Sequence, residues 1–388
     1  MKLLFFMINL NLGGTEKSFL NLVHVLPKSW EIDVILLENK GLLLEQIPAN
    51  VNVTLISDNE MINDFIHTPP KPLCKKLFKK SFLVLSKYIL LYTLSRIKKR
   101  HSIIYDSICY SKLNNIYDYA VAFAGPHDFI TYYIINHVSA RTKIQWIHFD
   151  LSSIYFSLNE AKHFYPKFDK IVSVTEVSTK MLIQKIDEIQ NKTITIHNFL
   201  NKGRIIELSK ETVYENIEDN IIKILTVGRL THEKGHHLFI PVVARLKEDK
   251  INFIWYIIGE GTYKPQLLEL INMYDVADRI VFLGSQLNPY KFLKYADIYL
   301  QPSLYEGYCI TIAEAKILNL PIIATTTAGT NQIINNKNGL LVNTDEESIY
   351  TGIKKMLDIK LRSFFKRNLY DEIDEDCSLN NIRVLFDF

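Results

Sequence analysis

The sequence predicts an α/β fold with two Rossmann-like domains, each built around a parallel sheet. Short apolar runs rich in Val and Ile alternate with stretches of helical periodicity through both halves of the chain. The 388 residues suffice for two cores of ordinary size. Residues 199–220 lose the strand pattern and become polar and charged. We therefore expect a first domain over residues 1–200, a second over 201–358 and a final segment over 359–388.

Seven apolar segments of the first domain are predicted to form strands. They span residues 3–8, 33–37, 51–56, 118–123, 143–149, 170–175 and 193–197. After the first of them, Gly13 and Gly14 predict a turn, and Leu20, Val23 and Leu26 then share one face of a helix. Glycines let backbone N–H groups approach an anion closely, although a pair of glycines also marks any tight turn.

Two cations follow a predicted strand of the second domain. Residues 223–227 (KILTV) are rich in β-branched and apolar side chains, Gly228 ends the strand, and Arg229 and Lys234 come next. Ligands of open α/β sheets bind at the carboxyl ends of the strands, where Arg and Lys can bind phosphate. Solvated loop cations are the simpler interpretation of the same pattern.

Two glutamates flank the start of a predicted helix. A strand over 296–303 is followed by a loop with Glu306 and Gly307, and then by a helix over 310–318 that contains Glu314. The free N–H groups of a helix N-terminus attract anions, and carboxylates accept hydrogen bonds from sugar hydroxyls. Alternatively, each glutamate is a plain surface charge, which at the helix start would complement the helix dipole.

Residues 221–345 resemble the donor-binding domain of retaining GT-B glycosyltransferases of family 4. The hallmark of that family is two glutamates separated by seven residues, found here as EGYCITIAE from Glu306 to Glu314. VGRLTHEKGHHLFI is similar to the phosphate-binding segment of the family, IIGEGTYKPQLLEL to the strand and loop that follow, and RIVFLGS to the base-contacting loop. PIIATTTAGTNQIINNKNGLLV is similar to the closing strand and loop. The resemblance implies a GT-B fold, with two Rossmann-like domains across a cleft and a final segment, 359–388, that can return to the first domain.

The resemblance also implies roles for single residues. Arg229 and Lys234 would stabilise the negative charge of the departing diphosphate. Glu306 would bind hydroxyls of the sugar, Glu314 would bind the ribose, and Gly14 would face the phosphate or the acceptor. The implied catalytic residues are His148, Arg229, Lys234 and Glu306. The implied donor-binding residues are Gly13, Gly14, Arg229, Lys234, Gly259, Gly284, Glu306, Gly307, Tyr308, Cys309, Ile310 and Glu314. No metal ligand and no cofactor besides the donor are expected.

Two histidines compete for a place at the reacting sugar. His148, in WIHFD, matches a strand of the family that ends in His-Asp, which implies contact with the transferred sugar. His127, in AGPHDF, follows another predicted strand. A lone buried histidine is more often a core residue than a functional one.

The chain departs from the family pattern at two places. Tyr308 and Cys309 stand where many relatives have smaller or proline-containing pairs, which implies a reshaped sugar pocket. Gln332 stands where relatives often have a glutamate, which affects one contact on the donor side.

These features predict transfer of a sugar from a nucleotide-diphosphate sugar to a glycan or lipid-linked acceptor, with retained configuration. We expect a UDP-sugar as donor and a role in surface polysaccharide or glycolipid synthesis. The alternatives are a catalytically silent subunit, a phosphorylase or an epimerase. A Rossmann dehydrogenase is disfavoured because GEGTYK lacks the third glycine of the dinucleotide fingerprint.

A basic, apolar segment stands out in the first half. From Lys71 to Arg100 there are ten basic and no acidic residues, in a chain whose net charge is only +3. With the apolar residues between them, this pattern is typical of an amphipathic segment that lies on an anionic membrane surface. A solvated basic face is the alternative, and nothing resembles a nucleic-acid recognition motif.

The remaining patterns favour a cytoplasmic protein, peripheral on the inner face of the plasma membrane. Four cysteines show neither metal-ligand nor disulfide spacing. The apolar run 82–94 contains Lys87 and is too short to span a bilayer comfortably.

Overall fold

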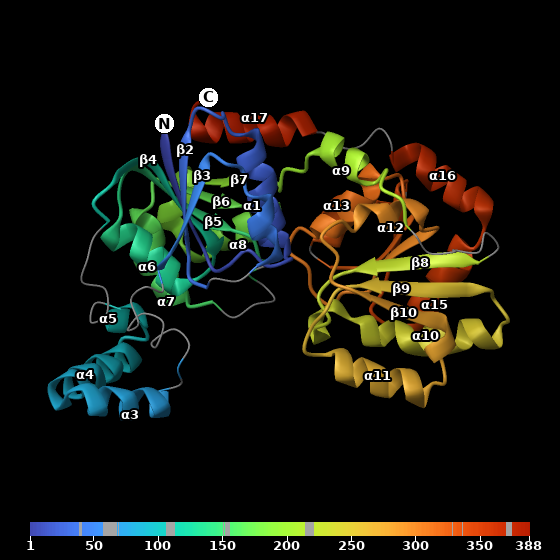
Figure 1. Ribbon diagram of the computed structural model, residues 1–388, viewed down its shortest axis with the longest axis horizontal. Coiled ribbons are helices and arrows are strands. Elements are labelled where there is room, and N and C mark those ends of the chain that lie inside the picture. Colours follow the sequence, from blue (N-terminus) through green and yellow to red (C-terminus); the bar gives the residue numbers. More distant parts are fainter. Residues whose placement is uncertain are drawn as a thin grey trace. The chain divides into compact units, whose positions relative to one another are not determined.

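The computed structural model contains two α/β units (Figure 1). The first unit comprises Met1–Asn11, Thr15–His197 and Phe386–Phe388, and the second comprises Leu12–Gly14 and Asn198–Leu385. The structure describes residues 1–38, 41–56, 68, 70–105, 113–149, 151, 156–213, 221–327, 329–335, 337–369 and 375–388. The chain therefore passes from the first unit to the second after His197, a few residues before the predicted boundary.

The first unit is built on a seven-stranded parallel sheet in the order β3-β2-β1-β4-β5-β6-β7. The strands are β1 (Lys2–Met7), β2 (Glu31–Leu36), β3 (Val51–Leu55), β4 (Ile116–Gly125), β5 (Ser139–Ile147), β6 (Lys170–Ser173) and β7 (Thr193–Thr195). Each strand overlaps one of the seven predicted apolar segments, so the predicted parallel sheet is confirmed.

Helices pack on both faces of this sheet. The helices of the first unit are α1 (Gly14–Val25), α3 (Pro70–Lys80), α4 (Phe82–Ile97), α5 (Ser102–Tyr105), α6 (Asp128–His137), α7 (Leu158–Phe164) and α8 (Glu176–Lys185), of which α3 and α4 lie at the periphery (Figure 1). Among the described residues, no helix is both long enough and apolar enough to cross a bilayer.

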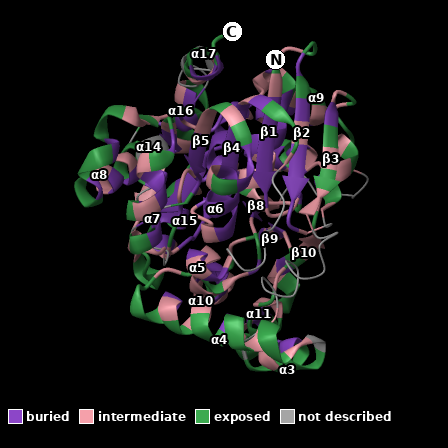
Figure 2. Cartoon of the chain, turned by 90° about the vertical axis from the view of Figure 1, so that its left-hand side faces the viewer, coloured by how far each residue is buried: buried purple, intermediate pink, exposed green. Residues whose placement is uncertain are grey.

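Alternate residues of β1 pack on opposite faces of the sheet, because successive side chains of a strand point to opposite sides. Phe6 contacts Phe129 of α6, with ring centroids 6.3 Å apart. Phe5 contacts Phe19 of α1 at 5.3 Å and Phe386 of the last helix at 6.4 Å. The central strands β1 and β4 are almost wholly buried and β5 is buried in its second half, whereas α3 and α4 are largely exposed (Figure 2).

The second unit has a six-stranded parallel sheet in the order β10-β9-β8-β11-β12-β13. Its strands are β8 (Ile222–Val227), β9 (Phe253–Ile258), β10 (Ile280–Gly284), β11 (Ile298–Gln301), β12 (Ile322–Thr325) and β13 (Gly339–Val342). Both units thus have the predicted Rossmann-like architecture.

Two apolar layers enclose the second sheet. The helices of this unit are α9 (Lys202–Leu208), α10 (His236–Glu248), α11 (Lys264–Met273), α12 (Tyr290–Tyr295), α13 (Ile310–Ile317), α14 (Thr330–Ile333), α15 (Glu346–Met356), α16 (Ile359–Leu369) and α17 (Glu375–Phe386). Ile224 of β8 packs in one layer with residues of α10, α11, α15 and α16. Its neighbour Leu225 packs in the other layer with residues of α9, α12 and α13.

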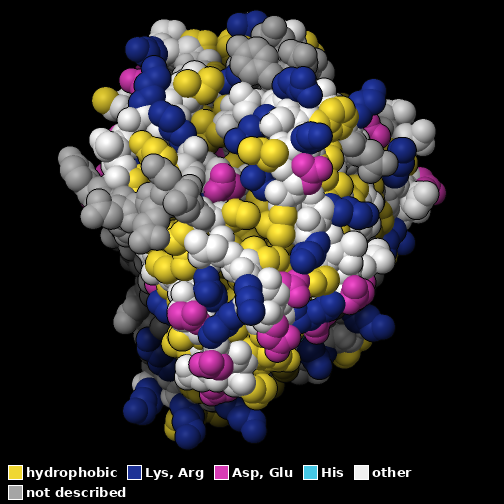
Figure 3. Space-filling view, turned by 90° about the vertical axis from the view of Figure 1, so that its right-hand side faces the viewer, with side chains coloured by type: hydrophobic (Ala, Val, Ile, Leu, Met, Phe, Trp, Pro, Cys, Tyr) yellow, Lys and Arg dark blue, Asp and Glu magenta, His cyan; other side chains and the backbone are white. Residues whose placement is uncertain are grey.

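The surface of the second unit carries charges of both signs in pairs. Arg245 of α10 lies 2.8 Å from Glu347 of α15, and Lys354 of α15 lies 2.9 Å from Asp249. On the face of the molecule that Figure 3 shows, Lys and Arg side chains are likewise interspersed with Asp and Glu.

The C-terminal segment divides between the two units. Phe365 and Leu369 of α16 are buried in the core of the second unit, and Leu385 is the last residue of that unit. Phe386–Phe388 belong to the first unit, where Phe386 also packs against Tyr119 with 5.3 Å between ring centroids. The return to the first unit is therefore confined to the last residues, whereas the sequence allowed it for all of 359–388.

We predict that Phe386→Ala destabilises the first unit by about 3–5 kcal/mol, because the ring is fully buried among other aromatic rings. Urea unfolding followed by tryptophan fluorescence measures the change. Val384→Ala, 74% exposed on the same helix, is the control and is expected to change stability by less than about 0.5 kcal/mol. Equal effects of the two substitutions would show that the packing of Phe386 does not stabilise the first unit.

Candidate active site at the carboxyl ends of β8 and β11

The candidate site lies where β8 and β11 end. β8 pairs with β9 on one side and with β11 on the other, so the strand order reverses between β8 and β11. At such a switch point the connections leave toward opposite faces of the sheet, and a crevice for ligands opens between them. Arg229 and Lys234 follow β8, and Glu306 follows β11, so the fold brings these predicted residues to one edge.

Lys234 and Glu306 form an ion pair at this edge. The distance from Lys234 Nζ to Glu306 Oε1 is 2.8 Å, and the side chains are only 19% and 6% exposed. Burial alone would lower the pKa of Lys234, but the adjacent Glu306 carboxylate outweighs it and raises that pKa above its ordinary value. The lysine is therefore a fixed positive charge at neutral pH.

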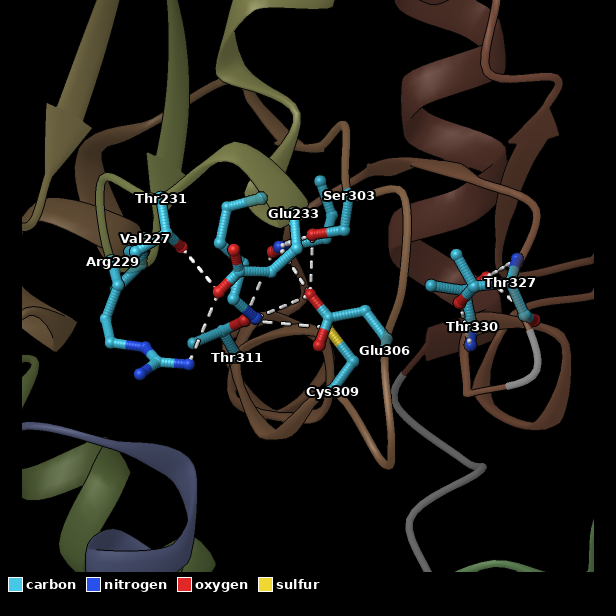
Figure 4. A network of polar contacts seen from close by, with 12 residues as sticks. Val227, Arg229, Thr231, Glu233, Ser303, Glu306, Cys309, Thr311, Thr327 and Thr330 are labelled. Atoms are coloured by element: carbon cyan, nitrogen blue, oxygen red, sulfur yellow. Dashed lines mark hydrogen bonds and ion pairs between the residues drawn. The ribbon is translucent and has the colours of Figure 1, made fainter. Parts of the chain in front are cut away.

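A buried polar network holds the Glu306 carboxylate in place (Figure 4). Glu306 Oε1 also accepts from Ser303 Oγ at 2.6 Å and from Gln301 Nε2 at 3.0 Å. Gln301 Oε1 in turn accepts from Tyr299 OH at 2.5 Å and from Thr311 Oγ1 at 3.2 Å. Buried polar groups are costly unless they are satisfied, so these bonds restrict the carboxylate to this position.

Two glycines press against the loop that carries Glu306. A Cβ atom on Gly235 would lie 1.9 Å from the carbonyl oxygen of Pro302, and one on Gly329 would lie 2.0 Å from that of Gly307. Gly235 also has a φ of +66°, which a residue with a side chain rarely adopts. Both positions therefore require glycine, and their close approach fixes the loop between β11 and α13.

Arg229 lies beside this network and is more exposed. Its guanidinium is 3.5 Å from Glu233 Oε1, and its side chain is 60% exposed. Glu233 Oε1 also accepts from Thr231 Oγ1 at 2.7 Å. Burial alone would raise the pKa of Glu233, but the bond from Thr231 and the charges of Arg229 and Lys234 lower it. In Figure 4, Glu233 lies between Arg229 and the network around Glu306, so one carboxylate orients the exposed cation.

Glu314 is held separately on the buried side of α13. It is fully buried, and its Oε1 accepts from Tyr290 OH of α12 at 2.8 Å. Burial and this carboxylate raise the pKa of Tyr290 well above its usual range. The interpretation of Glu306 and Glu314 as surface charges is therefore wrong, since both are buried and hydrogen-bonded.

The turn into α13 places apolar side chains inward. Cys309 precedes the helix with a φ of 41°, in the left-handed region that residues with a side chain seldom adopt. Cys309 and Ile310 are buried, Tyr308 packs against the same core, and burial raises the pKa of the Cys309 thiol. This segment, from Gly307 on, therefore offers a ligand its backbone more than its side chains.

The other predicted glycines lie near strand and helix ends. The Gly259 N–H, after β9, donates to the carbonyl oxygen of Gly284 at the end of β10, at 2.8 Å. These two residues therefore share the carboxyl edge with Gly228, whose N–H donates to the last residue of β9. Gly13 and Gly14 stand at the start of α1 and belong to the second unit.

The two histidines belong to the first unit and have different surroundings. His148 follows β5, is 7% exposed and packs against Phe123 and Trp146, with ring centroids 4.4 and 6.0 Å away. His127 precedes α6, where its Nδ1 accepts from the backbone N–H of Ile130 at 3.4 Å. His127 thus caps a helix, and the role of His148 at the sugar stays a prediction.

Sequence reasoning missed several residues that position the predicted ones. Gln301 and Ser303 hold Glu306, Tyr290 holds Glu314, and Glu233 holds Arg229. A glutamine at the end of an otherwise apolar strand was one available signal, because buried polar side chains need partners. The side chain of Gln332 lies outside the described part of the structure.

Two observations define the fold class of the protein. Both units are parallel α/β sheets, and the structure of Anabaena HepE in complex with UDP-glucose matches the whole chain, with a TM-score of 0.72 at 17% identity over 100% of this chain and 99% of that one. The chain therefore has the GT-B fold.

The second unit resembles a known protein family. Residues 209–372 match the family described as glycosyl transferases group 1. An uncharacterized glycosyltransferase of Methanocaldococcus jannaschii is 35% identical over 167 residues, which cover 42% of this chain and 41% of the relative.

A second relative is named for its reaction. It is the N-acetylgalactosamine-N,N'-diacetylbacillosaminyl-diphospho-undecaprenol 4-alpha-N-acetylgalactosaminyltransferase of Campylobacter jejuni. It is 31% identical over 206 residues, which cover 52% of this chain and 54% of the relative. The chain thus spans about half the length of these two curated relatives.

We predict that Tyr290→Phe destabilises the second unit by about 1–3 kcal/mol, because the substitution removes a donor from the buried Glu314 carboxylate. Thermal or urea unfolding of the full chain measures the loss. Tyr295→Phe on the same helix, where the side chain is 42% exposed, is the matched control and is expected to be nearly neutral. A neutral Tyr290→Phe would mean that other groups suffice to hold Glu314.

Proposed function

We propose that this chain is a glycosyltransferase that moves a sugar from a UDP-sugar to a lipid-linked or glycan acceptor, with retention of configuration. The observation that carries the proposal is the buried Lys234–Glu306 pair at the carboxyl edge of the group 1 segment, with Arg229 beside it. This edge combines fixed positive charge for a diphosphate with a carboxylate for sugar hydroxyls.

The cations have the properties that a departing diphosphate needs. Negative charge grows on the leaving group as the bond to the sugar breaks, and charges already in position stabilise it without reorganisation. Lys234 is held charged by Glu306, and Arg229 is exposed enough to meet a ligand. We therefore assign diphosphate binding to these two side chains and to the backbone at the start of α13.

The carboxylates are assigned to the hydroxyl groups of the donor. Three donors within the described residues, from Lys234, Gln301 and Ser303, all bond Oε1 of Glu306. We propose that Oε2 of Glu306 accepts from the sugar, while Glu314, oriented by Tyr290, accepts from the ribose.

The acceptor and the location are proposed from the relatives. The name of the Campylobacter relative specifies an acceptor linked to diphospho-undecaprenol. We propose a lipid-linked acceptor here too, at the inner face of the plasma membrane, in the synthesis of a surface glycan. His148 is proposed to contact the transferred sugar, and no metal ion is required in the proposal because the cations serve the diphosphate.

The first test is donor turnover over a panel of nucleotide sugars, with and without a metal chelator. We expect release of UDP from one UDP-sugar in both conditions. Arg229→Ala is expected to lower the rate about a hundredfold, as loss of a transition-state contact does. Glu314→Gln is expected to weaken binding of the donor, because its ribose contact is made in the ground state as well. Arg245→Ala is the control, because that cation pairs with Glu346 and Glu347 at the surface and is expected to leave the rate unchanged.

Other outcomes separate the alternatives. Failure of calorimetry to detect binding of any nucleotide would contradict the proposal and favour a silent subunit. Inverted anomeric configuration in the product, read by NMR, would refute retention while leaving transfer intact. Loss of turnover with the chelator, restored by a divalent cation, would refute metal independence.

A further inference from the structure

The basic segment of the first unit folds into two helices with an exposed apolar surface. α3 and α4 are separated at Ser81 and pack against each other. Leu73 and Leu77 of α3 and Tyr88 of α4 are at most 5% exposed and join the core of the first unit. One side of the pair is therefore anchored, and Figure 1 shows α3 and α4 at the periphery of this unit.

The opposite side of α4 is mostly apolar, and it also holds Ser86 and Thr93, whose exposed hydroxyls donate to the backbone carbonyl oxygens of Leu83 and Ile89. Phe82, Leu83, Ile89, Leu90 and Ile97 are 70%, 77%, 50%, 60% and 72% exposed. Their spacing of one, six, one and seven residues places them on one stripe of the helix. Scattered exposed apolar residues are ordinary, but several large apolar side chains gathered on one side of a solvent-facing helix mark an interaction surface.

Cations flank this apolar stripe. At 100° per residue, Lys87 and Arg96 of α4 fall on its two borders, and both are exposed. Lys75 and Lys79 are exposed on α3, and Lys98 follows α4. No acidic residue occurs between Lys71 and Arg100, unlike the paired charges on the second unit.

We propose that the apolar stripe of α4, with its two flanking cations and the exposed cations of α3, docks on an anionic lipid bilayer. Large apolar side chains would enter the boundary between headgroups and acyl chains, and the cations would lie at the level of anionic headgroups. A protein partner with a mixed surface would leave this excess of positive charge unmatched. The docking surface does not depend on sugar transfer, although it would bring the first unit to a lipid-linked acceptor.

The test is co-flotation of the full-length protein with phosphatidylcholine vesicles that contain or lack phosphatidylglycerol. We expect binding only with the anionic lipid, weakened by salt. Lys75→Gln with Lys79→Gln is expected to weaken binding by at least about tenfold, since each basic residue near the surface contributes about fivefold. Equal binding to both vesicle types, or to neither, would overturn the proposal.

Leu83→Asp with Leu90→Asp tests the apolar stripe. We expect flotation to be lost while the circular dichroism spectrum and nucleotide binding stay unchanged, which separates this inference from the proposed reaction. Ile116→Asp is the matched control, because Ile116 is also 77% exposed, at the start of β4. Flotation that survives the double substitution would refute the surface. A dimer by light scattering that this variant converts to a monomer, without vesicle binding by either, would instead assign the stripe to a second copy of the chain.

Discussion

The buried ion pair between Lys234 and Glu306 is the interaction on which the candidate site depends. Two charges removed from water are stable only if their mutual attraction and additional hydrogen bonds replace hydration. Ser303 and Gln301 supply those bonds to the carboxylate. The pair also joins the segment after β8 to the loop after β11, so it closes the edge of the sheet where a donor would bind.

Several neighbouring residues help to position this ion pair and Arg229. Gly235 allows the segment after Lys234 to approach Pro302, and Gly329 allows the closing loop to approach Gly307. Glu233 forms an ion pair with Arg229, and this pair orients the exposed guanidinium. A bound diphosphate would compete with Glu233 for Arg229. It would not displace Glu306 from Lys234, so Lys234 would contact the diphosphate while still paired with Glu306.

Local sequence patterns predicted the fold and the sheet edge at which the candidate site lies. They did not predict the contacts between side chains within the site. Apolar periodicity and strand ends follow from neighbouring residues, so the strands and the positions of Arg229, Lys234 and Glu306 could be predicted. Tyr290 and Glu314 are 24 residues apart in the sequence, and Lys234 and Glu306 are 72 apart. Contacts between residues so far apart depend on tertiary packing. The basic segment was predictable as amphipathic, but which face of α4 is exposed depends on how the helix packs.

The most direct test of the account is a double-mutant cycle on the ion pair, with Lys234→Met, Glu306→Leu and both together. Trp255 is fully buried in the second unit, so its fluorescence reports unfolding there once Trp30 and Trp146 are replaced by Phe. We expect Lys234→Met to lower the free energy of unfolding by about 3–5 kcal/mol, and the double variant to lower it by clearly less than the sum of the single ones. Additive losses, within about 0.5 kcal/mol, would show that the two side chains do not depend on each other and would contradict the account.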